Sequence, residues 1–138
     1  MKTLVSFTVL VVLMISAGCS QTPQPVTEQT EAAIIEFETT EHDFGTIPQG
    51  GDGTYEFVFR NKGKVPLVLA NVRSSCGCTI PEWPKRPIHK GKEGKIKVSY
   101  NTRIIGGFSK TISVYSNAEV TPIVLKITGR VEEVETEQ

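Results

Sequence analysis

Short segments in which apolar and polar residues alternate constrain this chain more than any other feature. Apolar side chains recur at every second position in residues 55–59, 96–100, 112–115 and 123–127. Turn-forming Gly, Asn and Asp residues separate these segments. A period of two is typical of β-strands with one buried face, whereas an amphipathic helix repeats about every 3.6 residues.

Residue choice supports the same conclusion. Beyond Cys19 the chain has eleven Val and eleven Ile, but only three Leu and no Met. β-Branched residues lose side-chain freedom in helices and fit pleated sheets. Three more segments, 34–39, 42–47 and 66–73, bring the expected number to about seven short strands. The sequence therefore predicts an all-β fold, a single immunoglobulin-like β-sandwich over residues 34–131, with a closed barrel as the alternative.

The first 18 residues have the three parts of a secretory signal peptide. Lys2 precedes an apolar run at residues 4–15, and small residues follow that run. The run is too short to span a membrane, since a transmembrane helix needs about 20 apolar residues. Ser16-Ala17-Gly18-Cys19 resembles a bacterial lipobox, in which the cysteine is lipidated and becomes the mature N-terminus. The alternative is ordinary secretion, with Cys19 as a stray thiol.

A lipidated Cys19 predicts a palmitate-type anchor, because several acyl chains hold a protein on a membrane where one would not. The expected location is the bacterial cell envelope, on the outer membrane facing the periplasm. Residues 19–33 are polar and contain no aromatic residue, which predicts a flexible tether between anchor and domain. Residues 132–138 are predicted to form a disordered acidic tail.

Cys76 and Cys78 flank Gly77 at the end of a predicted strand, and four interpretations of the pair stay open. The pair forms a structural disulfide, as expected in an oxidising compartment, or it remains as two free thiols that pack. Alternatively it binds a soft ion such as copper or zinc. Apart from Cys19, only His42 and His89 could help to complete a zinc site. In the fourth interpretation, a small and strained ring serves thiol–disulfide exchange.

No other motif indicates catalysis. His42 and Asp43 are adjacent on a predicted strand, so their side chains point to opposite faces and cannot easily hydrogen-bond. The chain has no nucleophile elbow, phosphate-binding loop or calcium loop. We therefore expect no catalytic residues and no small-molecule substrate, with thiol redox chemistry as the exception. Trp83 lies in the proline-rich segment 81–87 and either plugs one end of the sandwich or serves as an exposed recognition residue.

Charge is balanced overall and unevenly distributed. The 15 basic and 15 acidic residues give a net charge of zero, so nothing indicates a nucleic-acid partner. Yet residues 19–59 have eight acidic residues and no Lys or Arg, while residues 60–110 have twelve basic residues and two acidic ones. Either neighbouring strands neutralise each other, or the excess forms a basic face for an anionic partner or lipid headgroups.

Several segments together resemble a known family. They are His-Asp-Phe-Gly-Thr-Ile at residues 42–47, Phe-Val-Phe-Arg-Asn at 57–61, Ser-Cys-Gly-Cys-Thr at 75–79 and Gly-Arg-Val at 129–131. In this order they resemble the bacterial envelope family of domains of unknown function numbered fifteen-seventy-three. The resemblance implies an immunoglobulin-like fold, related to major sperm protein, ASH and pilus-chaperone domains. It brings no settled activity, although relatives in fold mostly bind other proteins, often through an edge strand.

The leading functional hypothesis is a membrane-anchored envelope lipoprotein without a resident cofactor. It would act as a non-enzymatic protein-binding or assembly module, with another envelope protein as its partner. The alternative is a copper-handling or thiol-redox protein that uses Cys76 and Cys78. The state of these cysteines separates the two hypotheses, because a reducible disulfide or a bound copper ion favours the second.

Overall fold

The structure is a computed structural model that describes residues 31–135. This part of the chain forms eight strands and no helix. The strands are β1 (Ile35–Phe37), β2 (Glu41–Pro48), β3 (Thr54–Asn61), β4 (Leu69–Ser74), β5 (Thr79–Glu82), β6 (Glu93–Tyr100), β7 (Gly106–Ser116) and β8 (Ile123–Glu132). Among residues 31–135, therefore, nothing helical could cross a membrane.

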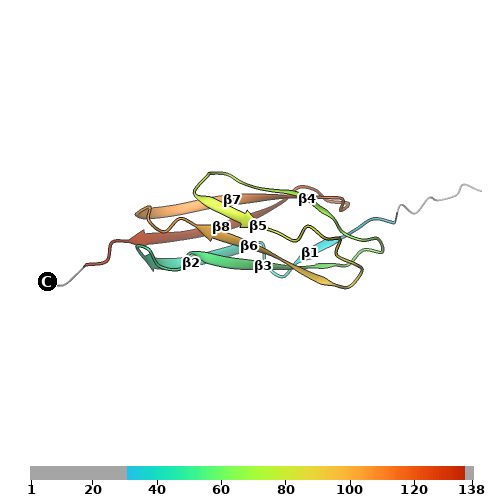
Figure 1. Cartoon of the computed structure of the whole chain (residues 1–138), viewed down its shortest axis with the longest axis horizontal. Coiled ribbons are helices and arrows are strands. Elements are labelled where there is room, and N and C mark those ends of the chain that lie inside the picture. Colours follow the sequence, from blue (N-terminus) through green and yellow to red (C-terminus); the bar gives the residue numbers. More distant parts are fainter. Residues whose placement is uncertain (1–30, 136–138) are drawn as a thin grey trace, which may run out of the picture.

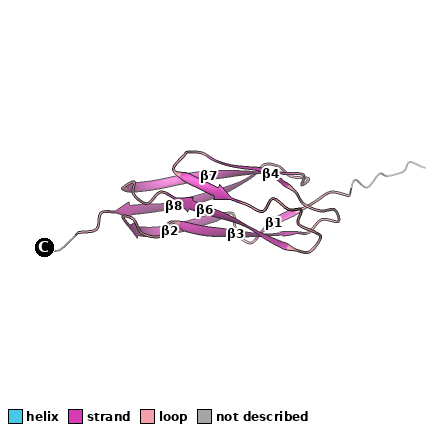
Figure 2. Ribbon diagram, viewed as in Figure 1, coloured by secondary structure: helices cyan, strands magenta, loops and turns pink. Residues whose placement is uncertain are grey.

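The strands form two sheets, and each sheet has four strands (Figures 1 and 2). One sheet has the order β1-β3-β6-β5, and the other has the order β2-β8-β7-β4. Strands β2 and β8 pair in parallel, and the other pairs are antiparallel. The predicted immunoglobulin-like β-sandwich is confirmed. The described chain begins at one end of the sandwich, and β8 finishes at the opposite end (Figure 1).

The core lies between the two sheets and follows the alternation of the sequence. Phe57 and Phe59 on β3 and Ile96 on β6 point inward, where they meet Ile112 on β7 and Leu125 on β8. All five side chains are fully buried. Removing such side chains from water is the main stabilising contribution, about 1.5–3 kcal/mol for each large apolar residue.

The structure has eight strands where the sequence predicts about seven, and the additional strand is β5. Its third residue, Pro81, makes the segment resemble an irregular loop in the sequence. The Asn101 amide donates to the Cys78 carbonyl at 2.8 Å, which sets the bonding pattern between β5 and β6. Because bonded and non-bonded pairs alternate in an antiparallel ladder, the main-chain groups of Thr79 and Pro81 point away from β6. Proline is therefore tolerated, since no ladder bond needs its missing N–H.

Regular structure extends slightly beyond residues 34–131. Ala33, expected at the end of the tether, is fully buried and forms a bridge with Ala118. Glu132, expected in the tail, is the last residue of β8. The predicted signal peptide, Cys19 and most of the tether lie outside the described residues, as do residues 136–138.

Part of the uneven charge distribution is neutralised between neighbouring segments. Lys95 on β6 contacts Glu56 on β3 at 3.0 Å, and Arg60 on β3 pairs with Glu93 on β6. Lys62 lies 3.7 Å from Glu36 on β1. These pairs are exposed, so each contributes little to stability. The Lys95–Glu56 and Lys62–Glu36 pairs show that the acidic and basic segments, separate in sequence, meet on one sheet.

Candidate functional site

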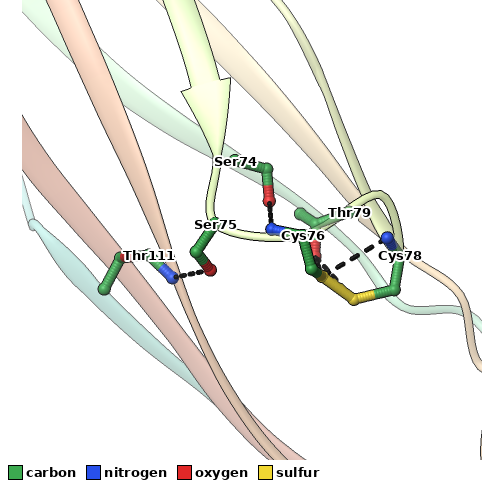
Figure 3. Close-up of a disulfide and its surroundings, with 6 residues drawn as sticks. All are labelled: Ser74, Ser75, Cys76, Cys78, Thr79 and Thr111. Atoms are coloured by element: carbon green, nitrogen blue, oxygen red, sulfur yellow. Dashed lines mark hydrogen bonds between the residues drawn. A yellow bond between two sulfur atoms is a disulfide. The ribbon is translucent and has the colours of Figure 1, made fainter.

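Strands β4 and β5 are edge strands of different sheets, and the loop of residues 75–78 joins them. The chain therefore crosses from one sheet to the other along one side of the sandwich. This loop contains both cysteines of the described chain, Cys76 and Cys78. The open side of β4 and the loop together form the candidate site, which we call the β4–β5 edge (Figures 1 and 3).

Cys76 and Cys78 form a disulfide, with their Cα atoms 5.3 Å apart. The backbone N–H of Cys78 donates to the Cys76 sulfur at 3.3 Å, and the N–H of Cys76 donates to Ser74 Oγ at 3.3 Å. Both cysteines are half-buried, and Gly77 at the tip is exposed. Of the four interpretations that the sequence leaves open, the structure therefore has the bonded pair (Figure 3).

The backbone on both sides of the ring is held by groups other than the sulfur atoms. The Ser75 N–H donates to the Thr111 carbonyl at 2.8 Å, and the Thr111 N–H donates to Ser75 Oγ at 3.2 Å. On the other side, the Asn101 N–H donates to the Cys78 carbonyl. The loop is thus attached to β7 before the ring and to the end of β6 after it.

Thr79 places a hydroxyl beside the disulfide. Its side chain is only 3% exposed, and its Oγ1 lies 3.9 Å from the Cys76 sulfur and 4.0 Å from the Cys78 sulfur. These two sulfurs are its only hydrogen-bond partners within residues 31–135. Strand β5 fixes this position, because Thr79 is its first residue and pairs with Tyr100.

The side of β4 that faces away from β7 pairs with no other strand within residues 31–135. The Ser75–Thr111 bond sets the pattern between β4 and β7, so Asn71 and Arg73 bond towards β7. The N–H and C=O groups of Val72 and Ser74 then point away from β7, outward from the edge of the sheet. A bulge at the start of β4 interrupts the register between Leu69 and Asn71, and the register is regular beyond it.

The three other edge strands are each protected. Strand β1 has only three residues. Strand β2 contains a bulge at Gly45, which has a φ of 63° and whose N–H is taken by Asp43 Oδ1 at 2.9 Å. Strand β5 has four residues and presents Pro81, which has no N–H, to the open side. Short strands, bulges and prolines are the usual means of preventing edge pairing, and β4 has the least of them.

Side chains beside β4 suggest the chemistry of a partner. Arg73 is exposed and forms no ion pair with any residue of the described part. On the same outer face, Tyr115 is 39% exposed and Val124 is 51% exposed. An added strand would therefore meet one cation and a small apolar patch.

Trp83 packs against the core rather than standing free. Its side chain is half-buried, and its Nε1 is buried without a hydrogen-bond partner among the described residues. The Lys85 ammonium lies 3.0 Å from the centre of its ring, which covers that face of the indole. Trp83 therefore packs beside the core, and its role as a plug or a recognition residue stays a prediction.

His42 belongs to an aromatic cluster on the opposite side of the sandwich. Its ring stacks on Tyr55, with centroids 3.6 Å apart, and contacts Phe44 edge to face. Burial lowers the pKa of His42, and the neighbouring Asp43 carboxylate partly offsets this effect. As the alternation predicts, Asp43 accepts from the Gly45 N–H and not from His42.

The described residues bring no three His, Cys, Asp or Glu side chains together as a metal-binding set. The bonded cysteines offer no thiolate while the ring is closed. Copper or zinc binding by Cys76 and Cys78 therefore stays a prediction that requires the reduced pair.

The sequence matches the model of the family described as "Protein of unknown function (DUF1573)" over residues 35–131. No curated protein sequence matches the chain. A protein of unknown function from Porphyromonas gingivalis W83 is similar in structure, with a TM-score of 0.66 and 17% identity. The similarity covers 72% of this chain and 47% of that protein, so the chain spans about half of its length.

Two further solved structures have the same fold. The ASH/PapD-like domain of human CEP192 has a TM-score of 0.65 and 12% identity, covering 85% of this chain and 97% of that domain. The YadV chaperone has a TM-score of 0.51 and 14% identity, covering 75% of this chain and 54% of the chaperone. At these identities the comparison establishes the fold alone.

Proposed function

The chain belongs to the DUF1573 family, and within that frame we propose that it is a membrane-anchored module of the cell envelope that binds another envelope protein. This binding requires no catalysis. An extended segment of the partner adds to the free side of β4. The proposal combines an anchor at Cys19 with a single binding edge.

The unprotected edge of β4 is the observation that carries this proposal. Beyond the bulge of β4, Val72 and Ser74 direct two N–H and two C=O groups away from β7, and the other three edges are shortened, bulged or blocked by proline. Main-chain hydrogen bonds supply affinity in strand addition, and neighbouring side chains supply specificity. Arg73 favours a carboxylate in the partner segment, and Tyr115 favours an apolar residue beside it. The likeness to the YadV chaperone supports this reading only through the shared fold.

The position of the edge fits a protein held by its N-terminus. The described chain enters the fold next to Ala33, which pairs with Ala118 in the β7–β8 connection. The Cys78 carbonyl instead bonds Asn101 in the β6–β7 connection, at the other end of the sandwich (Figure 1). With a lipid on Cys19, the disulfide loop would lie on the half of the domain farther from the N-terminal attachment.

A photo-crosslinking residue at Arg73 tests the binding edge in intact cells. We expect a specific protein adduct at Arg73 and none at Glu36, an exposed position on the short strand β1. A second pair of variants tests the main-chain mechanism. Ser74→Pro removes an outward N–H, as Pro81 does on β5, and should abolish the adduct. Ser74→Ala removes only the side-chain contact to the Cys76 N–H and should keep it. Adducts that survive Ser74→Pro would refute strand addition.

Labelled palmitate tests the anchor separately. The wild-type protein should incorporate the label, and the Cys19→Ala variant should not. Absence of label from the wild type would refute the lipoprotein assignment and leave the binding edge untouched.

A further inference from the structure

The Cys76–Cys78 disulfide is surrounded by hydrogen-bond donors that a purely structural cross-link does not need. The Cys78 N–H is 3.3 Å from the Cys76 sulfur, and the buried Thr79 hydroxyl lies 3.9 Å from it. We propose that this disulfide is redox-active and oxidises the cysteine pairs of other proteins. In this reaction Cys76 forms the mixed disulfide, and Thr79 is a positioning residue for the Cys76 sulfur.

The two sulfurs differ in a way that gives the reaction a direction. The Cys78 side chain packs against the buried core, whereas Cys76 has no place in that cluster. Cys76 is therefore the more accessible sulfur for an incoming thiolate. It is also the sulfur that accepts the Cys78 N–H, so a negative charge on it is stabilised.

The reaction takes two exchange steps. A thiolate of the substrate attacks the Cys76 sulfur, the Cys76–Cys78 bond breaks, and Cys78 leaves as a thiolate that takes up a proton. The second substrate thiolate then attacks the substrate sulfur in the mixed disulfide, and Cys76 leaves as a thiolate. The substrate pair loses two electrons and two protons and becomes a disulfide. Cys76 and Cys78 gain both electrons; one proton goes to Cys78, and the other goes to solvent while Cys76 remains a thiolate.

Thr79 affects how strongly the ring oxidises. Donors that stabilise the reduced thiolate make the corresponding disulfide a stronger oxidant. Within residues 31–135 the Thr79 hydroxyl has no other acceptor than the two sulfurs, so its hydrogen is available to the thiolate of Cys76. A hydrogen bond to a charged group is among the stronger ones in proteins.

The fold should persist when the ring opens. Ser75 remains bonded to Thr111, and Cys78 remains bonded to Asn101, because neither contact involves a sulfur atom. Reduction and oxidation then change the chemistry of the loop and leave the sandwich intact. This activity uses the sulfur atoms and not the open side of β4, so it stands or falls independently of the binding proposal.

Mixtures of reduced and oxidised glutathione test the proposal on the full-length protein purified in detergent. Trypsin releases both cysteines in one peptide, residues 74–85, which separates them from Cys19. Differential alkylation of this peptide gives the midpoint of reduction. We expect half of the protein to be reduced at a ratio of reduced to oxidised glutathione that these mixtures cover. Thr79→Val should favour the disulfide and raise the ratio needed for half reduction about tenfold. Thr111→Val is the matched control, since its hydroxyl does not contact the sulfurs, and should leave the midpoint unchanged.

Single-cysteine variants test the direction of the reaction. The Cys76 thiol of the Cys78→Ser variant should form a mixed disulfide with oxidised glutathione about ten times faster than the Cys78 thiol of the Cys76→Ser variant. The oxidised wild type should convert a reduced dithiol peptide to its disulfide, with one ring reduced for each peptide oxidised. A ring that stays closed at every glutathione ratio would overturn the proposal. Equal rates for the two thiols, or no shift with Thr79→Val, would overturn the assigned roles of Cys76 and Thr79.

Discussion

Two loop regions of this sandwich are held in different ways. At the end where the described chain begins, the buried side chain of Asn61 joins several segments through hydrogen bonds. We call this region the Asn61 node. At the β4–β5 edge, a disulfide closes a ring of only three residues. The first region is fixed by many non-covalent contacts between distant segments, and the second by one covalent bond between near neighbours.

The Asn61 node connects parts of the chain that are far apart in sequence. Asn61 Oδ1 accepts the Gly63 N–H at 2.9 Å, and Nδ2 donates to the carbonyls of Val65 and Ile88 at 2.8 and 2.9 Å. The Ile34 N–H also points to Oδ1, at 3.5 Å. The node thus ties the residue before β1, the β3–β4 loop and the β5–β6 loop together.

This difference distinguishes the Asn61 node, which stabilises the fold, from the disulfide ring, which can react without unfolding the protein. Every polar atom in the Asn61 node is needed, because an unpaired buried group costs about 1–3 kcal/mol. The small ring, in contrast, restricts little of the unfolded chain, and its flanks are bonded independently. Loss of the node should therefore damage the fold, while opening of the ring should not.

Asn61→Ala should give the largest loss of stability, about 3 kcal/mol. The substitution leaves the Gly63 N–H and the Val65 carbonyl without a partner inside the protein. Urea denaturation measures the change in the free energy of unfolding. Asn71→Ala on β4 is the control, since its side chain takes part in no such network, and should change stability by less than about 0.5 kcal/mol. Equal losses for the two variants would remove the distinction on which the comparison rests.

A pair of glycine substitutions compares the same two regions by steric packing instead of by hydrogen bonding. A Cβ at Gly63 would lie 2.7 Å from Ala33 Cα and would also collide with the main chain of Ala32, and these atoms cannot rotate away. Gly63→Ala should therefore cost about 2 kcal/mol. A Cβ at Gly77 meets nothing within 4 Å, so Gly77→Ala should be nearly neutral. Thermal unfolding of both variants checks the difference, and a destabilised Gly77→Ala would show that the ring has less freedom than its geometry indicates.

Opening the ring should have a moderate effect on stability. The double variant Cys76→Ser, Cys78→Ser should lose about 1.5 kcal/mol, since the entropic gain from closing a very short loop is small. The far-ultraviolet circular dichroism spectrum should stay unchanged. A double variant that fails to fold would assign the disulfide to the structural class and would contradict the redox proposal at its base.

The sequence predicts the strands well where period-two alternation is uninterrupted, as in β3, β6 and β8. It misses β5, because a proline normally disfavours a strand. Pro81 is tolerated only because its main-chain groups point away from β6. This orientation of Pro81 depends on the pairing of β5 with β6, which the residues around Pro81 do not reveal. Charge illustrates the same limit, since Lys95 meets Glu56 across strands 39 residues apart.

The candidate sites follow the same rule. Cys76-Gly77-Cys78 is visible in the sequence as a pair of close cysteines, yet the sequence leaves four chemical states open for it. The hydroxyl of Thr79 lies beside the sulfurs only because β5 pairs with β6, and the local sequence does not show this pairing. Asn61 appears in the sequence as part of an Asn-Lys-Gly turn signal, and its role as a buried node depends on partners 27 residues away. The open edge of β4 likewise depends on the order of strands in the sheet.

The smallest expected effect comes from pH and concerns the His42–Tyr55 stack, which holds β2 against β3 without a disulfide or a hydrogen-bonded node. Burial lowers the pKa of His42 in the folded protein, so between that value and about 6.5 the unfolded chain binds more protons. Stability is therefore fully present above pH 6.5 and declines as pH falls through this window. The urea midpoint of unfolding should fall slightly less between pH 7.5 and pH 5.5 for His42→Phe than for the wild type. This variant keeps an aromatic ring in the stack. His89→Gln, at an exposed position, should match the wild type. If His42→Phe keeps the full pH dependence, the decline comes from other groups and the stack is not a pH-sensitive contact.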